Sequence, residues 1–181
     1  IYMSNKNHWL SFELSKKNRT IINETNTKIN NIFESLDVMD YNLIHMTSVF
    51  LGKSLQGKNK NILIKANNII NNSIKELNNI NVILTFDRFD YLPFDKKYKK
   101  LLVAIYNENI KLKSWNCCLR KELNKLGICN YITDNFMPHI TIGKVKHIYP
   151  INELNKYSYP NIHIKNMYLD GIRHKYILQS L

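Results

Sequence analysis

Glycine and cysteine are scarce in this chain, and acidic residues are fewer than basic ones. The scarcity of glycine and that of cysteine each argue against a class of protein. Only 5 of the 181 residues are glycine, and Gly52-Lys53-Ser54 lacks the upstream glycine of a P-loop, which excludes ATP binding of that kind. The 3 cysteines, Cys117, Cys118 and Cys129, form neither an even disulfide framework nor a C-x-x-C motif. We therefore expect a reducing compartment, cytoplasmic or nuclear, with Cys117 and Cys118 as small apolar fillers of a helix.

Long apolar runs are also missing. No stretch approaches the roughly 18 apolar residues that a membrane-spanning helix needs, and no secretory hydrophobic region opens the chain. We expect a soluble intracellular protein without a membrane span; a targeting segment upstream of Ile1 is left open. A length of 181 residues suits one domain, so residues 1–181 are expected to form a single two-lobed domain and a monomer.

Basic residues outnumber acidic ones, with 26 Lys and Arg against 14 Asp and Glu and a net charge of +12. Such a balance favours polyanionic partners such as RNA or nucleotides. The chain is also rich in Asn, Ile, Lys and Tyr, residues with AT-rich codons, so part of the lysine excess has a genomic explanation. Whether the charge is functional has to be decided by the geometry of a site.

The hydrophobic periodicity predicts an α+β protein with largely antiparallel sheets rather than a doubly wound parallel sheet. A C-terminal cap at Gly127 and a turn at Asp170-Gly171 are expected as well. The expected strands are 8–14, 43–51, 82–86 (extended or followed by Phe89 and Tyr91 and stopped by Pro93), 101–106, 139–145, 162–169 and 176–181. The apolar positions that mark the expected helices span 22–36, 63–77 and 112–126. Two strands that each follow a helix occupy comparable places, which suggests two pseudo-symmetric lobes.

The same short pattern, His-x-Thr in an apolar strand-like run, occurs on both of these strands. It is His45-Met46-Thr47 in the first and His139-Ile140-Thr141 in the second. Two of 6 histidines would have Thr two positions later by chance in roughly 2% of such chains. Side chains alternate along a strand, so each His and its Thr point to the same side. Two such strands could line one cleft.

Two histidines in one cleft can divide a proton transfer between them. One neutral ring accepts a proton from a nucleophile while one protonated ring donates to the leaving oxygen, which phosphodiester cleavage requires. The hydroxyls of Thr47 and Thr141 would bind the non-bridging phosphate oxygens. A metal site fits less well, because no acidic residue lies within either motif. Cysteine catalysis would require tertiary structure to bring Cys129 to a histidine.

The segments 45–52 (HMTSVFLG) and 138–142 (PHITI) resemble the two signatures of the 2H phosphoesterase superfamily. The chain looks most like the branch that contains the LigT (2′-5′ RNA ligase-like) proteins and the related domain of A-kinase anchoring proteins. The resemblance implies a bilobal, pseudo-symmetric α+β fold with two sheets flanked by helices and a central cleft. It also implies action on RNA or nucleotide phosphodiesters, with no cofactor and no metal.

The resemblance assigns catalysis to His45 and His139 and phosphate binding to Thr47 and Thr141. Ser48 departs from the family, which usually has an aliphatic residue there; we expect a local packing change. The family also suggests that Phe50 contacts a base, but simple alternation puts Phe50 on the face opposite His45, so we expect it in the core unless a bulge intervenes.

Three functions therefore remain open. The first is a metal-independent phosphodiesterase that acts on RNA ends, 2′,3′-cyclic phosphates or 2′-5′-linked oligonucleotides. The alternative is a non-catalytic nucleotide- or RNA-binding module that uses the same cleft. A third reading, a domain that interacts only through its basic face, predicts binding that collapses in high salt. The sequence does not choose the linkage, nor which histidine is the base.

Overall fold

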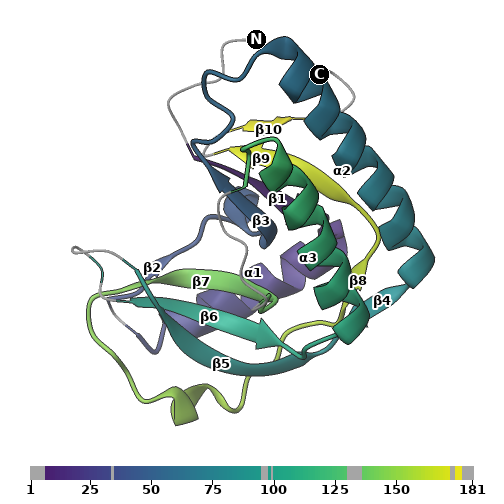
Figure 1. Cartoon of the computed structure of the whole chain (residues 1–181). Helices are drawn as coiled ribbons and strands as arrows, with labels where there is room; N and C mark the ends of the chain where they lie inside the picture. Colours follow the sequence, from purple (N-terminus) through teal and green to yellow (C-terminus); the bar gives the residue numbers. More distant parts are fainter. Residues whose placement is uncertain are drawn as a thin grey trace.

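The computed structural model describes residues 7–33, 35–94, 98, 100–129, 136–171 and 174–176, with side chains up to residue 169. It is an α+β structure with every strand pair antiparallel, as the sequence predicts. The main sheet has the order β10-β9-β1-β3-β7-β6-β5, with β2 paired to β7, and β4 and β8 form a separate pair (Figure 1).

The helices are α1 (Lys16–Asn30), α2 (Lys60–Ile80) and α3 (Ile110–Lys125), with 3-10 turns at Tyr41–Leu43 and Ile151–Leu154. The strands are β1 (His8–Phe12), β2 (Asp37–Val38), β3 (Met46–Gly52), β4 (Val82–Leu84), β5 (Phe86–Pro93), β6 (Lys100–Tyr106), β7 (His139–Val145), β8 (Ile162–Ile164), β9 (Met167–Gly171) and β10 (His174–Tyr176). Side chains of Ser15, Asn59 and Asn109 cap the three helices at their N-termini.

The main sheet consists of two halves that meet at the motif strands. One half is β10-β9-β1-β3 and the other is β7-β6-β5 with β2. Strands β3 and β7 are joined through a single residue pair, Met46 with Ile140. Helices α2 and α3 lie along the first half, and α1 lies behind the second (Figure 1). The expected two sheets are thus two halves that touch where the His-x-Thr motifs lie.

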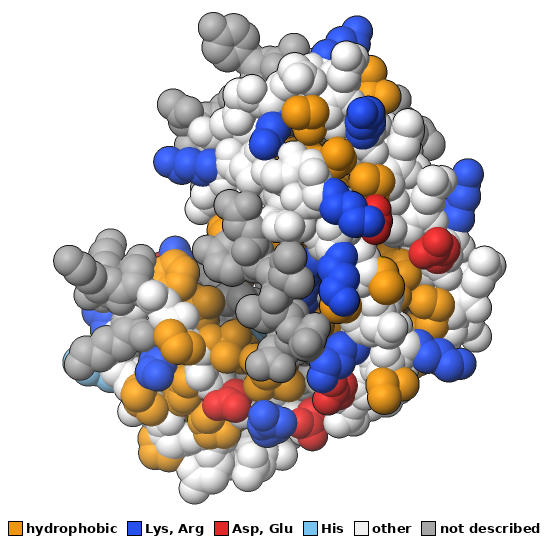
Figure 2. All heavy atoms as spheres, viewed as in Figure 1, with side chains coloured by type: hydrophobic (Ala, Val, Ile, Leu, Met, Phe, Trp, Pro, Cys, Tyr) orange, Lys and Arg blue, Asp and Glu red, His pale blue; other side chains and the backbone are white. Residues whose placement is uncertain are grey.

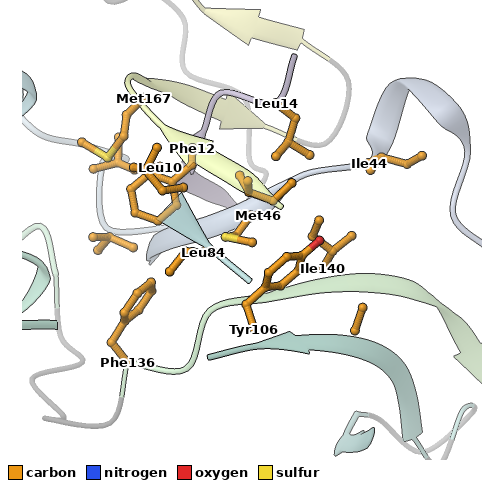
Figure 3. Packing of buried hydrophobic residues seen from close by; sticks show 14 of the residues in the cluster. Leu10, Phe12, Leu14, Ile44, Met46, Leu84, Tyr106, Phe136, Ile140 and Met167 are labelled. Atoms are coloured by element: carbon orange, nitrogen blue, oxygen red, sulfur yellow. The ribbon is translucent and has the colours of Figure 1, made fainter. Parts of the chain in front are cut away.

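The core continues through this junction. Met46 and Ile140, the middle residues of the two motifs, are both fully buried. Figure 3 shows Met46 close to Phe12 and Leu10 of β1, with Ile140 and Tyr106 beyond it. Burial of an apolar side chain of this size contributes about 1.5–3 kcal/mol. The apolar residue between each His and Thr therefore packs into the core and fixes the position of its motif strand.

Several predicted element boundaries differ from those of the structure. The expected helix within 22–36 ends at Asn30, and a hydrogen bond from the Ile32 amide to the Ile29 carbonyl (3.0 Å) tightens its end. The expected strands 82–86 and 162–169 are each split, because β4 and β8 pair with each other outside the main sheet whereas β5 and β9 enter it. Local periodicity cannot detect such a change of partner strand.

The C-terminal strand pair also differs from the prediction. β9 runs through Asp170 and Gly171, the positions expected to form a turn, because both pair with β1. Of the expected strand 176–181, Tyr176 ends β10 and the remainder lies outside the described residues. Gly127 has a positive φ of 64° after α3, so the predicted C-terminal cap is confirmed. Within the described residues, no helix is long and apolar enough to cross a membrane.

Candidate active site

The rings of His45 and His139 are each held by a hydrogen bond to the backbone carbonyl two residues earlier in the chain. Nδ1 of His45 lies 2.7 Å from the carbonyl oxygen of Leu43, and Nδ1 of His139 lies 2.9 Å from that of Met137. A carbonyl can only accept, so Nδ1 carries a proton in both rings. Nε2 is then the nitrogen that binds or releases a proton when the ring titrates, which is the property a general acid or base needs.

Strand pairing brings the two motifs together. Because Met46 pairs with Ile140 in an antiparallel register, His45 falls across from Thr141 and Thr47 falls across from His139. Residues that face each other in this way have Cβ atoms about 4.5–5.5 Å apart. The sequence alone predicts that each His has the Thr of its own motif on the same side of the strand. The strand register shows that each His also faces the Thr of the other motif.

Each motif strand carries a β-bulge directly after its Thr. Leu10 and Ser11 of β1 pair with Val49 and Thr47, so Ser48 is the extra residue of β3. In the same way, Ile142 is the extra residue of β7, where the partners of the neighbouring β6 residues are Gly143 and Thr141. Because of each bulge, the two residues that follow the Thr are both buried. The third residue after the Thr, Phe50 in β3 and Lys144 in β7, lies on the same face as the histidine.

The bulge corrects the expectation for Phe50. Simple alternation predicted a core residue, but Phe50 is 43% exposed. The extra residue Ser48 shifts the alternation by one, so Phe50 shares the face of Thr47 and lines the same pocket as His139. The contact to a base that the family resemblance suggests is therefore compatible with the position of Phe50.

A pocket of about 230 Å³ opens on this face. Its wall is contributed by β3, by α3 and by the chain that leads into β7. The lining residues are Thr47, Ser48, Val49, Phe50, Arg120, Cys129, Phe136, Met137 and His139. His45 and Thr141 do not line it, so the pocket extends to one side of the two rings, beside His139.

The two rings have different surroundings. Burial lowers the pKa of His139 below the ordinary value of 6.5, the hydrogen bond to Met137 partly opposes this, and the nearby charge of His45 lowers it further. The His45 ring instead stacks on the indole of Trp9, with ring centroids 5.2 Å apart and planes inclined by 26°. An indole face attracts a cation. The surroundings thus favour a neutral His139 and can accommodate a charged His45.

Ser48 connects the motif strand to a buried polar network. The amide of Asn116 donates to the Ser48 carbonyl at 2.9 Å and to its hydroxyl at 3.1 Å. Asn116 in turn accepts from Nε of Arg120 at 2.5 Å. The local change expected at Ser48 is therefore a hydrogen bond to α3, in place of an apolar contact.

Asn116 and Arg120 were not predicted from the sequence as residues of the site. Both lie on the buried face of α3, four residues apart. A signal was present, because two polar residues at positions i and i+4 interrupt the apolar stripe that contains Leu112, Leu119 and Leu123. Buried polar side chains on such a stripe require partners. Here Asn116 bonds to Ser48 on the motif strand, and Arg120 bonds to Asn116.

Two of the rival chemistries can be compared with the structure. Cys129 lines the pocket together with His139, but the residue is completely buried. The prediction that Cys118 is an apolar filler of the helix is wrong, because Cys118 is exposed. Among the residues described, no group of three or more His, Cys, Asp or Glu side chains could hold a metal ion.

Basic side chains do not form one continuous patch on the face shown in Figure 2. Lys and Arg side chains are spread over this face, with uncharged and acidic side chains between them. Long-range attraction of an anion is compatible with this distribution. Recognition of a particular anion has to come from the site itself.

The chain has the α+β fold of the solved LigT and phosphoesterase structures. No protein-family model and no curated protein matches it. Among solved structures, E. coli LigT complexed with 3′-AMP is 15% identical, with a TM-score of 0.58 over 93% of this chain and 88% of that one. The protein TT0787 of Thermus thermophilus is 16% identical, with a TM-score of 0.57 over 90% of this chain and 83% of that one.

A further solved structure has the same fold. The MHV ns2 PDE domain is 12% identical and has a TM-score of 0.60, covering 94% of this chain and 99% of its own. Identities this low establish the fold, and the chemistry has to be argued from the residues of this chain.

Proposed function

We propose that this chain is a metal-independent phosphodiesterase that acts on RNA or nucleotide phosphodiesters by two-histidine acid–base catalysis. The observation that carries the proposal is the pairing of β3 with β7, which sets His45 across from Thr141 and Thr47 across from His139. Both rings also use Nδ1 on a backbone carbonyl, which leaves Nε2 as the titrating nitrogen. The candidate substrates are RNA ends, 2′,3′-cyclic phosphates and 2′-5′-linked oligonucleotides.

In the proposed hydrolysis, water attacks phosphorus and transfers a proton to Nε2 of the neutral ring. The bond from phosphorus to the leaving ribose oxygen breaks, and Nε2–H of the charged ring protonates that oxygen. The hydroxyls of Thr47 and Thr141 donate to the non-bridging oxygens, whose negative charge grows in the transition state. Each positioned acid or base contributes about 10²–10⁴-fold in rate.

The surroundings of the rings favour His139 as the base and His45 as the acid. Burial lowers the pKa of His139, so its neutral form predominates at neutral pH. The indole of Trp9 stacks on His45 and stabilises positive charge on that ring. A substrate bound in the opposite direction would exchange the two roles.

A non-catalytic nucleotide-binding module is the second candidate. The pocket beside His139 with the exposed Phe50 favours it, because this geometry can hold a base and a phosphate without turnover. Some solved structures with the same fold are described as complexes of E. coli LigT with 3′-AMP, ATP and NADP+. Product analysis after long incubation separates this candidate from an enzyme.

The deciding experiment is a screen of 2′,3′-cyclic nucleotides and of 2′-5′- and 3′-5′-linked oligonucleotides in the presence of EDTA, with products identified by mass. Wild type should release product, and His45→Ala and His139→Ala should each reduce the rate by at least about 10²-fold. His163→Ala is a matched control, because His163 lies on β8 and bonds to Asn81. Activity that persists in both motif variants would refute the proposed catalysis.

A further inference from the structure

A second cavity, of about 520 Å³, opens next to the pocket beside His139 and has no role in the chemistry proposed above. It lies between the start of β5, the end of β6, the first turn of α3 and the segment 136–138. Phe136 and Met137 line both the pocket and this second cavity, so the two spaces adjoin. Sites for small organic ligands have volumes of about 300–1,000 Å³, so the second cavity is large enough for a nucleoside.

Strand pairing places the second cavity on the side of His139 that faces away from β3. Ile105 of β6 pairs with His139, and Arg88 of β5 pairs with Ile105. Residues paired across antiparallel strands share a face of the sheet, so these three side chains follow one another on the face of the motif histidine. The first pocket is instead lined by Thr47 and Phe50 of β3 together with His139. A ligand whose phosphate meets His139 can therefore extend to both sides of that ring.

Backbone hydrogen bonds fix the wall of the second cavity next to the histidine. The amide of Tyr106 donates to the Pro138 carbonyl at 2.9 Å, which joins the end of β6 to the chain that enters β7. The carbonyl of Met137 accepts from Nδ1 of His139 at 2.9 Å. The same short segment thus forms the cavity wall and orients the ring. A preformed wall lowers the cost of ordering when a ligand binds.

The charges in the wall of the second cavity cancel. Lys113 bonds to Glu108 and Arg88 bonds to Asp87, so each cation of the wall has a carboxylate partner in the same wall. These bonds use Oε1 of Glu108 and Oδ2 of Asp87, and the other oxygen of each carboxylate can accept a hydrogen bond from a ligand. Ile105 adds apolar surface. Such a wall suits the uncharged base and ribose of a nucleoside better than a second phosphate.

Resting on the proposed function, we propose that the second cavity binds the nucleoside that lies across the scissile phosphate from the nucleoside in the first pocket. The substrate is then an oligonucleotide whose scissile phosphate joins two nucleosides. A nucleoside 2′,3′-cyclic phosphate contains a single nucleoside and would occupy only one of the two spaces. The carboxylates of Asp87 and Glu108 accept hydrogen bonds from hydroxyl or amino groups of the second nucleoside.

The test compares ligands of equal charge by titration calorimetry. The diadenosine monophosphates with a 3′-5′ or a 2′-5′ linkage and adenosine 5′-methyl phosphate each contain one phosphodiester, and only the former contain two nucleosides. The full chain with His45→Ala is used, because the proposed mechanism then gives little turnover. This protein should bind at least one diadenosine monophosphate about tenfold or more tightly than the methyl ester.

Addition of Asp87→Ala and Glu108→Ala should reduce this preference at least about threefold, because the carboxylate acceptors are lost. The ligands have the same charge, so attraction by the two unpaired cations cancels in the comparison. Glu122→Ala is the matched control, because Glu122 is also an exposed carboxylate that bonds to a lysine, Lys125, and lies outside both walls. This control should retain the full preference.

Photo-crosslinking provides a second measurement that needs no variant of the cavity. Diadenosine monophosphates with 8-azidoadenosine at one nucleoside or at the other should label different peptides, and one of the two should label the segments 87–88, 105–108 or 113. The proposal is overturned by equal affinity for all ligands, by full preference in the folded Asp87→Ala/Glu108→Ala variant, by an equal loss in Glu122→Ala, or by labelling of none of these segments.

Turnover of the same diadenosine monophosphates by wild type is measured separately. A preference that depends on the second cavity, without turnover, would support the nucleoside site and refute the catalysis. Turnover without such a preference would support the catalysis and refute the nucleoside site.

Discussion

Removal of the Phe50 ring should weaken binding of ligands that contain a base. Phe50 is 43% exposed in the pocket wall, so Phe50→Ala removes an aromatic surface without opening a core cavity. Stacking of a base on an aromatic side chain contributes about 1–3 kcal/mol, which corresponds to about 5- to 150-fold in affinity. We expect the affinity for adenosine 3′-monophosphate to fall within this range while the melting temperature changes little.

The assay is titration calorimetry with two ligands and one matched variant. Ribose 5-phosphate has no base, so Phe50→Ala should bind it about as well as wild type does. Phe94 is 46% exposed and contacts Lys144 at the end of β5, outside the pocket wall, so Phe94→Ala should bind both ligands normally. The reasoning is refuted if Phe50→Ala binds the nucleotide as well as wild type does, or loses equal affinity for both ligands.

Two further predictions concern His139 and Gly143. Because burial lowers the pKa of His139 and the base must be neutral, kcat/KM should rise with pH through a value below 6.5. A pH profile whose acidic limb lies above that value would contradict the assignment. A Cβ added at Gly143 would lie 2.6 Å from the Asp37 carbonyl oxygen and 2.8 Å from Leu36 Cδ1. Gly143→Ala should therefore cost about 1–3 kcal/mol of unfolding free energy in urea denaturation, and an unchanged midpoint would show that β2 can move aside.

Much of the architecture was predictable because the spacing of apolar residues within each segment indicates whether it forms a helix or a strand. The apolar alternation of β1 and β7, the unbroken apolar run of β6 and the stripe of α3 identified these elements, and Gly127 marked the end of α3. The two strands that divided, at 82–86 and 162–169, could not be resolved, because their halves differ in partner strand and not in pattern.

The sequence by itself determined the residue types of the candidate site and the side to which each His and Thr points, because these follow from a repeat of two along a strand. Only the tertiary structure decided that β3 pairs with β7, and with which register, because that pair joins residues far apart in the chain. It also decided the bulges, which turn Phe50 toward the pocket and Ser48 toward Asn116. A bulge arises from the pairing of two strands, so the pattern of one strand does not contain it.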